Sequence, residues 1–166
     1  MTLIAAVAKN KGIGYKNNLL FRIPEDMRFF RETTLGKVIV MGHSTLKSFK
    51  GAKPLDGRTN IIMSRDKDLK IEGATVCGGV EGLFETLKKY DDKDVYVIGG
   101  QSVYGLLADY CDTALVTEID AESPADAFFD MIYKKAWQKV SESEKKEYDG
   151  VSYRFCEYKN NNKRTV

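Results

Sequence analysis

The acidic residue Asp26 lies in a setting that suits proton chemistry. It falls in the first turn of residues 24–33, which open with proline and two acids as a helix does. Helical spacing places Phe29 and Phe30 on the face of Asp26, and the apolar residues 19–21 come shortly before it. Apolar surroundings raise the pKa of a carboxyl group, which favours proton-linked chemistry near neutral pH. The helix dipole alone also favours an acid here, so a purely structural role stays open.

Two junctions have the composition of an anion site, because each runs from an apolar segment through glycine into residues with hydroxyl groups. The first contains Gly42, His43, Ser44 and Thr45, and the second contains Gly99, Gly100, Gln101 and Ser102. Glycine lets a ligand approach the backbone, and a helix N-terminus presents free N–H groups, so the pair suits a pyrophosphate. Neither junction matches the Rossmann, Walker or nucleophile-elbow pattern, and either alone is also typical of an ordinary strand-to-helix turn.

Arginine side chains could recognise the charged groups of a ligand. Arg58 follows the turn residues 54–57 and precedes an apolar run, and its planar guanidinium suits a carboxylate. Ser64 and Arg65 come at the carboxyl end of that run, where open α/β sheets bind ligands. Arginine in a turn is also common on any soluble surface, which leaves a surface role open for Arg58.

Composition excludes several classes of protein. The 166 residues, 43% hydrophobic and 30% charged, are typical of one soluble globular domain over residues 1–166. A net charge of +2 gives no reason to expect a nucleic-acid partner. Cys77, Cys111 and Cys156 with a single histidine do not make a zinc site, so we expect no metal and a reducing compartment. The apolar residues 3–8 are too short for a signal or membrane span, so we expect a cytoplasmic protein without a membrane partner.

The wider pattern predicts the elements that would position these residues. Runs rich in valine and isoleucine are typical of strands buried on both faces and comprise residues 3–8, 38–41, 60–63, 95–98 and 114–117. Helical spacing occurs in residues 24–33, 80–90 and 102–108. This alternation predicts an α/β fold with a largely parallel sheet.

The end of the chain has a different pattern. Residues 151–156 alternate apolar and polar side chains after the turn at Tyr148-Asp149-Gly150, which predicts an antiparallel hairpin with residues 137–144. The polar residues 159–166 predict a frayed tail.

Taken together, these segments resemble the dihydrofolate reductase family from about Ile4 to Tyr158. They occur in the family's order and comprise residues 4–8, 12–14, 23–27, 30, 40–42, 54–58, 60–64, 97–100, 103–104 and 117–119. Aspartate at position 26, where animal members have glutamate, and the short chain make the resemblance one to the bacterial type.

The resemblance implies a mostly parallel central sheet of eight strands with flanking helices and a C-terminal antiparallel strand. It implies reduction of 7,8-dihydrofolate to 5,6,7,8-tetrahydrofolate by NADPH, with hydride transfer to pterin C6 and protonation at N5, for one-carbon metabolism. The expected partners are dihydrofolate and antifolates, and the expected state is a monomer. Two alternatives stay open: a reductase of the riboflavin pathway, against which Asp26 and residues 54–58 speak, and a folate- or nucleotide-binding protein without turnover.

Site residues carry over from the same resemblance. Asp26 would bond the pterin 2-amino group and N3, Thr117 would support its carboxylate, and Leu19 and Phe21 would adjoin the reaction centre. The further substrate contacts would be Ile4, Ala5, Met27, Phe30, Phe49, Leu55, Ile98 and Arg58, which would hold the α-carboxylate. The cofactor contacts would be Ala6, Ile13, Gly14, Gly42, His43, Ser44, Thr45, Ser64, Arg65, Gly99, Gly100, Gln101, Ser102, Val103 and Tyr104. Residues 9–23 would form a mobile lid.

Three positions depart from the family pattern. Phe21 stands where most members have tryptophan, whose N–H holds a water near the pterin, and Leu20 stands where proline is usual. His43 stands where arginine or lysine commonly meets the 2′-phosphate. A preference for NADPH over NADH would therefore depend on Ser64 and Arg65.

Overall fold

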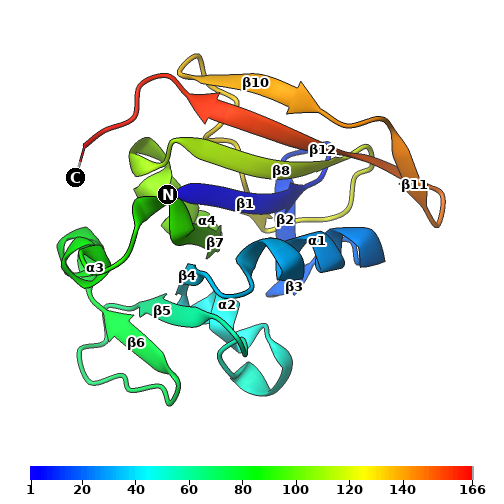
Figure 1. Ribbon diagram of the computed structural model, residues 1–166. Helices are drawn as coiled ribbons and strands as arrows, with labels where there is room; N and C mark the ends of the chain where they lie inside the picture. The colour runs from blue at the N-terminus through cyan, green and yellow to red at the C-terminus, as the bar shows by residue number, and fades with distance from the viewer. Residues whose placement is uncertain (166) are drawn as a thin grey trace.

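One mixed sheet forms the centre of the computed structural model, which describes residues 1–165 (Figure 1). In spatial order, its strands are β10 (Trp137–Glu142), β12 (Val151–Asn160), β8 (Thr113–Ile119), β1 (Thr2–Val7), β7 (Val95–Gly99), β4 (Val38–Gly42), β5 (Thr59–Met63) and β6 (Ala74–Cys77). The strands from β8 to β6 are parallel to their neighbours, and β12 runs antiparallel to β8 and β10. The expected eight strands and the C-terminal antiparallel strand are thus confirmed.

A ninth strand, β11 (Lys146–Tyr148), also pairs with β12. It forms because the strand predicted for residues 137–144 ends at Glu142, where Ser143 leaves the ladder. The hydroxyl of Ser143 accepts from Phe155 N at 2.9 Å, and the turn at residues 149–150 then joins β11 to β12.

The sheet is covered by helices on both faces, which explains why its strands read as continuous apolar runs. The helices are α1 (Pro24–Thr34), α2 (His43–Lys47), α3 (Gly79–Leu87) and α4 (Gln101–Leu107), with short 3-10 turns η1 (Lys50–Ala52), η2 (Asp92–Asp94) and η3 (Ala108–Tyr110). Leu83 of α3 and Leu107 of α4 pack in one hydrophobic cluster. Phe30 of α1 and Leu46 of α2 pack in another, which includes alternate residues of the same strands. The predicted α/β class is therefore confirmed.

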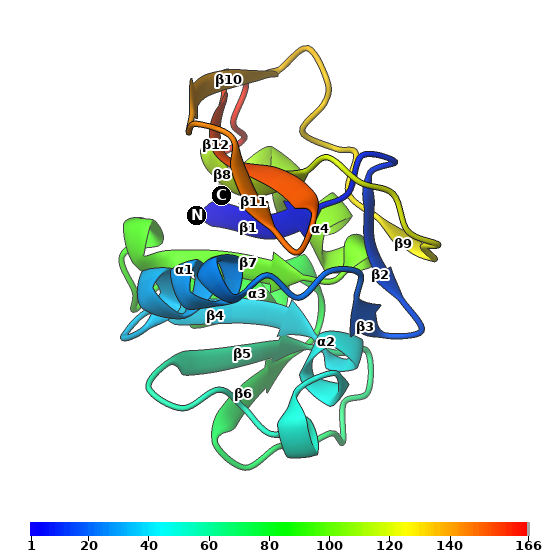
Figure 2. The same ribbon diagram turned by 90° about the vertical axis from the view of Figure 1, so that its right-hand side faces the viewer.

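A second, small sheet has the order β3 (Asn18–Leu19), β2 (Gly12–Tyr15) and β9 (Ala127–Phe128). Figure 2 shows this small sheet standing beside the ends of β4 and β7, next to α2. The segments before α1 and after β8 supply these strands. Both segments therefore lie at the edge of the main sheet where its parallel strands end.

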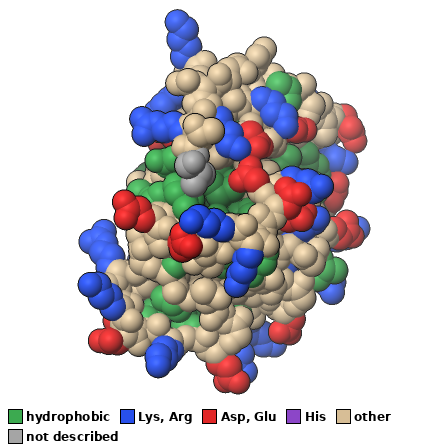
Figure 3. All heavy atoms as spheres, turned by 60° about the vertical axis from the view of Figure 1, so that its left-hand side comes forward, with side chains coloured by type: hydrophobic (Ala, Val, Ile, Leu, Met, Phe, Trp, Pro, Cys, Tyr) green, Lys and Arg blue, Asp and Glu red, His purple; other side chains and the backbone are tan. Residues whose placement is uncertain are grey.

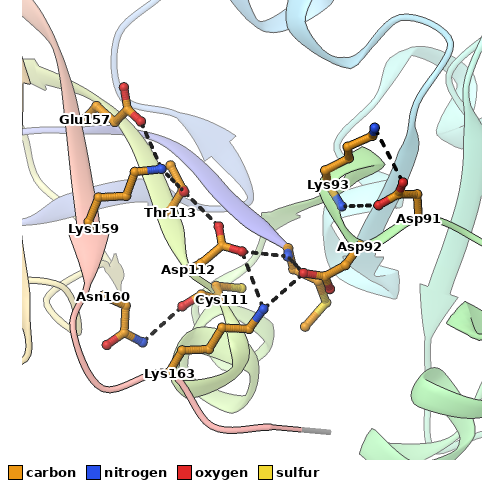
Figure 4. Close-up of polar contacts among 11 residues, drawn as sticks. Asp91, Asp92, Lys93, Cys111, Asp112, Thr113, Glu157, Lys159, Asn160 and Lys163 are labelled. Carbon is orange, nitrogen blue, oxygen red and sulfur yellow. Dashed lines mark hydrogen bonds and ion pairs between the residues drawn. The ribbon is translucent and has the colours of Figure 1, made fainter.

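The C-terminal segment is bound to the fold, which corrects the expectation of a frayed tail over residues 159–166. Strand β12 continues to Asn160, and Arg164 N donates to Asp109 O at 2.7 Å. The Lys163 ammonium lies 3.0 Å from Asp92 Oδ2 and 3.4 Å from Asp112 Oδ2 (Figure 4). Polar composition suggested a loose end, but the Lys163 cation lies opposite carboxylates that precede β7 and β8. Residue 166 lies outside the described residues.

Candidate active site

The Asp26 carboxylate meets the Thr117 hydroxyl between α1 and the main sheet. Thr117 Oγ1 donates to Asp26 Oδ1 at 2.5 Å, although 91 residues separate the two in the chain. Thr117 is only 2% exposed on β8, where its neighbours are Ala6 of β1 and Phe155 of β12. The helix begins at Pro24, so Asp26 falls in its first turn, as predicted.

Burial raises the pKa of the Asp26 carboxyl above its usual value, and the bond from Thr117 offsets only part of that rise. Burial is also the expected cause, but two of the side chains expected to contribute to it, Leu19 and Met27, are largely exposed. Leu19 is 53% exposed at the outer edge of the small sheet, and Met27 is 44% exposed on α1. These two side chains therefore do not enclose the carboxyl group, whereas Phe21 packs partly buried against a core cluster.

An apolar surface begins one helical turn beyond Asp26. Ile4 and Ile98 are buried in a single hydrophobic cluster, and Phe30, Phe49 and Leu55 pack against it while remaining partly exposed. These are the residues expected to contact the pterin and aminobenzoyl groups, so the structure brings them together. Such a wall suits a flat, largely apolar ligand.

Arg58 is held at the rim of this surface by backbone oxygens. Its Nε and Nη2 donate to Asp56 O at 3.0 and 2.8 Å, and Nη1 lies 3.4 Å from Thr34 Oγ1. Burial and the neighbouring Arg31 lower the pKa of the guanidinium, which nevertheless stays charged. The fixed, half-buried guanidinium is thus available to a carboxylate.

Asn60 is a positioning residue that sequence reasoning missed. It is 3% exposed at the start of β5, and its Nδ2 donates to Leu55 O at 2.9 Å and to Arg58 O at 3.1 Å. Its Oδ1 accepts from Leu55 N at 3.0 Å. One buried amide therefore fixes the turn that carries two of the expected substrate contacts. The available signal was a polar residue opening an otherwise apolar strand.

The two glycine junctions lie side by side, because Met41 of β4 pairs with Gly99 of β7. A Cβ atom added at Gly99 or Gly100, which are joined by a cis peptide, would lie 3.3 or 3.4 Å from Thr45 Oγ1. A Cβ added at Gly42 would lie 3.3 Å from Val103 Cγ2. The junctions therefore form one tight cradle of backbone, with α2 starting at one side and α4 at the other. Exposed N–H groups in such a cradle suit an anion.

The remaining residues expected at the cofactor take different positions. Ser44, Arg65, Gln101 and Ser102 are exposed, His43 and Ser64 are half-buried, and Ser64 Oγ accepts from Asp66 N at 3.1 Å. Tyr104 is buried, and its hydroxyl donates to Ile4 O at 2.6 Å. Burial, helped by the charge of Asp26, raises the pKa of Tyr104, so the hydroxyl keeps its proton. Tyr104 therefore connects α4 to β1 at Ile4, a residue of the apolar surface.

Residues 9–23, which include the small-sheet strand β2, are joined by hydrogen bonds to Asp126 and to α2. Gly14 O accepts from Asp126 N at 2.9 Å, and Lys16 N donates to Asp126 Oδ2 at 3.0 Å. Asn17 Nδ2 donates to Ser44 O at 2.8 Å, which links this segment to α2. Ile13 packs partly buried against the main core.

Within residues 1–165, no group of three or more histidine, cysteine or acidic side chains is arranged to hold a metal ion. Over the same residues, no helix combines the length and hydrophobicity needed to cross a membrane.

Comparison with known proteins adds independent findings. A sequence model described as dihydrofolate reductase matches residues 1–160. The dihydrofolate reductase of Neisseria meningitidis serogroup A is 35% identical over 159 residues, covering 95% of this chain and 96% of the relative. The type 3 dihydrofolate reductase of Salmonella typhimurium is 34% identical, and the match covers 95% of this chain and 94% of the relative. A solved dihydrofolate reductase from Enterococcus faecalis, complexed with NADP(H) and RAB-propyl, superposes with a TM-score of 0.86 at 30% identity, covering 96% of this chain and 95% of that one.

Proposed function

Because the chain belongs to the dihydrofolate reductase family, we propose that Asp26 and Thr117 bind the pterin of its substrate. The reaction is the NADPH-dependent reduction of 7,8-dihydrofolate to 5,6,7,8-tetrahydrofolate. The residue assignment rests on one observation: the half-buried Asp26 carboxylate accepts a hydrogen bond from the Thr117 hydroxyl. A carboxylate in this position accepts from the 2-amino group and N3, while Ile4 and Ile98 contact the ring.

The glycine cradle fits the pyrophosphate of NADPH, because α2 and α4 begin there side by side and glycine lets a phosphate approach the backbone N–H groups. When bound, NADPH supplies the hydride that reduces pterin C6. The N–H groups of residues 42–45 and 99–102 bind the two phosphates, and Ala6 and Ile13 adjoin the nicotinamide. Ser64 and Arg65, with His43, recognise the 2′-phosphate.

Protonation at pterin N5 requires a proton source beside the ring. The raised pKa lets Asp26 keep a proton to higher pH than an exposed aspartate, so it assists protonation indirectly while water delivers the proton. Phe21 has no N–H with which to hold that water, unlike the tryptophan usual in the family. Water must therefore be held by other groups of this site.

Arg58 binds the α-carboxylate of the substrate in two-pronged fashion. Its guanidinium already has two hydrogen bonds to Asp56 O, which limit its rotamers before ligand arrives. Asn60 maintains the turn beneath it, and Phe49 and Leu55 border the aminobenzoyl group between Arg58 and the pterin site.

The protein acts as a cytoplasmic monomer and binds antifolates at the dihydrofolate site. Support for a small-molecule site comes from the Enterococcus faecalis relative, which was solved with NADP(H) and RAB-propyl. Sedimentation of the purified protein with and without an antifolate tests the monomer: a single species at the mass of one chain is expected, and a dimer would contradict it.

The test of the assigned site is loss of NADPH absorbance on addition of dihydrofolate. Wild-type protein should oxidise NADPH promptly, and Asp26→Asn should slow turnover by about 100-fold or more, as loss of an acid–base group does. Asp68→Asn is the matched control, because Asp68 lies exposed in a loop. Equal rates in wild type and Asp26→Asn would refute the assignment of Asp26, and a wild-type protein that binds folate without oxidising NADPH would favour the binding-protein alternative.

A further inference from the structure

The side chain of Gln101 is already engaged with the small sheet. Gln101 is the first residue of α4, directly after the cis Gly99–Gly100 bond, and its Oε1 accepts from Phe128 N at 2.9 Å. Phe128 belongs to β9, which pairs with β2 in the small sheet. The resemblance placed Gln101 among the cofactor contacts, but this amide oxygen faces the small sheet.

Strand β9 and the residues beside it are also hydrogen-bonded to residues 9–23. Phe129 N donates to Lys11 O at 2.8 Å, and Asp126 binds both Gly14 and Lys16 through its backbone and side chain. The buried ring of Phe129 also packs edge-on against Tyr104 of α4, with centroids 4.8 Å apart. Segment 126–129 therefore lies between α4 and β2 and contacts both.

We propose that Gln101 is a positioning residue that couples the small sheet to the cofactor cradle, because its amide oxygen ties β9 to the residue that opens α4. This inference rests on the proposed function, in which the N–H groups at the start of α4 bind a phosphate of NADPH. Anchoring β9 fixes β2, and β2 carries Ile13 toward the nicotinamide half of the ligand. Gln101 thus strengthens binding of the nicotinamide end through the small sheet rather than by touching phosphate.

The coupling must be reciprocal, because it is a free energy shared between two sites. A ligand whose nicotinamide end contacts Ile13 of β2 then also stabilises the hydrogen bonds of the small sheet. Breaking the Gln101 contact should weaken NADPH binding but spare a fragment that lacks nicotinamide. A residue that binds phosphate directly would affect both ligands equally.

The experiment compares wild type with Gln101→Met, which keeps the length of the side chain and removes the acceptor. Dissociation constants are measured for NADPH and for its fragment 2′-phospho-ADP-ribose. Loss of one net hydrogen bond should weaken NADPH about three- to tenfold and the fragment less than about twofold. Gln138→Met, on exposed β10, is the matched control and should leave both constants unchanged.

Amide hydrogen exchange of the free protein gives a readout that needs no ligand. Exchange at Phe128 N–H should accelerate in Gln101→Met and return toward wild type in Gln101→Glu, which keeps an oxygen acceptor. Equal weakening of NADPH and the fragment, or unchanged NADPH affinity, would overturn the role of Gln101, as would unchanged exchange at Phe128. Failure of the wild-type protein to bind NADPH would instead contradict the proposed function itself.

Discussion

Asp26 combines two properties that oppose each other, a site from which water is partly excluded and a charge that prefers water. Its folded-state pKa is raised, so ionisation destabilises the fold, and the stabilising contribution of the neutral form is lost as pH rises through that pKa. A group kept in such a place usually serves chemistry rather than stability.

Asp26→Asn should therefore raise stability at neutral pH while it lowers activity. The amide can still accept from Thr117, so the contact remains and only the buried charge is removed. Urea unfolding at several pH values measures the effect. The difference in unfolding free energy should be largest above the raised pKa and should vanish below about pH 3.8, the ordinary value for aspartate. A variant less stable than wild type at neutral pH would contradict this view.

Asn60 tests whether a buried amide positions the substrate contacts above it. Asn60→Leu keeps the size of the side chain but leaves Leu55 N and two carbonyl groups without their partner. We expect a loss of about 1–3 kcal/mol of stability and a higher KM for dihydrofolate, with a smaller change in kcat. Urea unfolding measures the stability, and steady-state kinetics measure KM and kcat, with the exposed Asn162→Leu as the control. An unchanged KM would show that Asn60 does not position Arg58.

The strands were predictable where a continuous apolar run marked them, as in β4, β5 and β7. Strand β6 was missed because it has four residues at the edge of the sheet, and Thr75 within it is exposed. The small sheet was also missed, since its strands are short and form only through contacts between distant segments. Leu19 is exposed on the outer strand of that sheet and Met27 is exposed on α1, which helical or apolar spacing alone did not reveal.

Gly12 sets how closely β2 packs, and its substitution tests the small sheet as an element. A Cβ at Gly12 would lie 2.6 Å from Ala125 Cβ and 2.9 Å from both Asn10 Oδ1 and Leu20 Cδ1. Gly12→Ala should cost about 1–3 kcal/mol and lower kcat, because β2 must shift. Adding Ala125→Gly removes the closest clash and should restore part of both losses. Thermal unfolding and turnover of the single and double variants measure this, and no rescue would place the strain elsewhere.

At the scale of the whole molecule, positive and negative charges nearly balance, with 26 lysine and arginine residues against 24 acidic ones. Figure 3 shows lysine, arginine and acidic side chains interspersed on one face of the molecule. Figure 4 shows one local cluster of charges, in which Asp92 and Asp112 share the cations of Lys163 and the Met1 ammonium. Burial alone would raise the pKa of each carboxyl, but these cations, and the Thr113 hydroxyl at Asp112, hold both values below normal.

Lys163 should accordingly stabilise the fold in a pH-dependent way. Depressed carboxyl pKa values mean that the contribution is present above the unfolded value of 3.8 and is lost as pH falls through the folded values. Lys163→Met should cost about 1 kcal/mol or less at neutral pH, and less in high salt, because the lysine is partly exposed. Denaturant unfolding against the exposed control Lys70→Met measures it. A cost that persists unchanged in strong acid would exclude the ion pairs as its source.

The pH dependence of hydride transfer in a single turnover tests the role of Asp26 most directly. With NADPH and dihydrofolate both bound, the wild-type rate should fall as pH rises through the raised pKa of Asp26, and the Asp26→Asn rate should be low and independent of pH over the same range. A variant that keeps the wild-type rate and its decline with pH would show that Asp26 does not control protonation of the pterin.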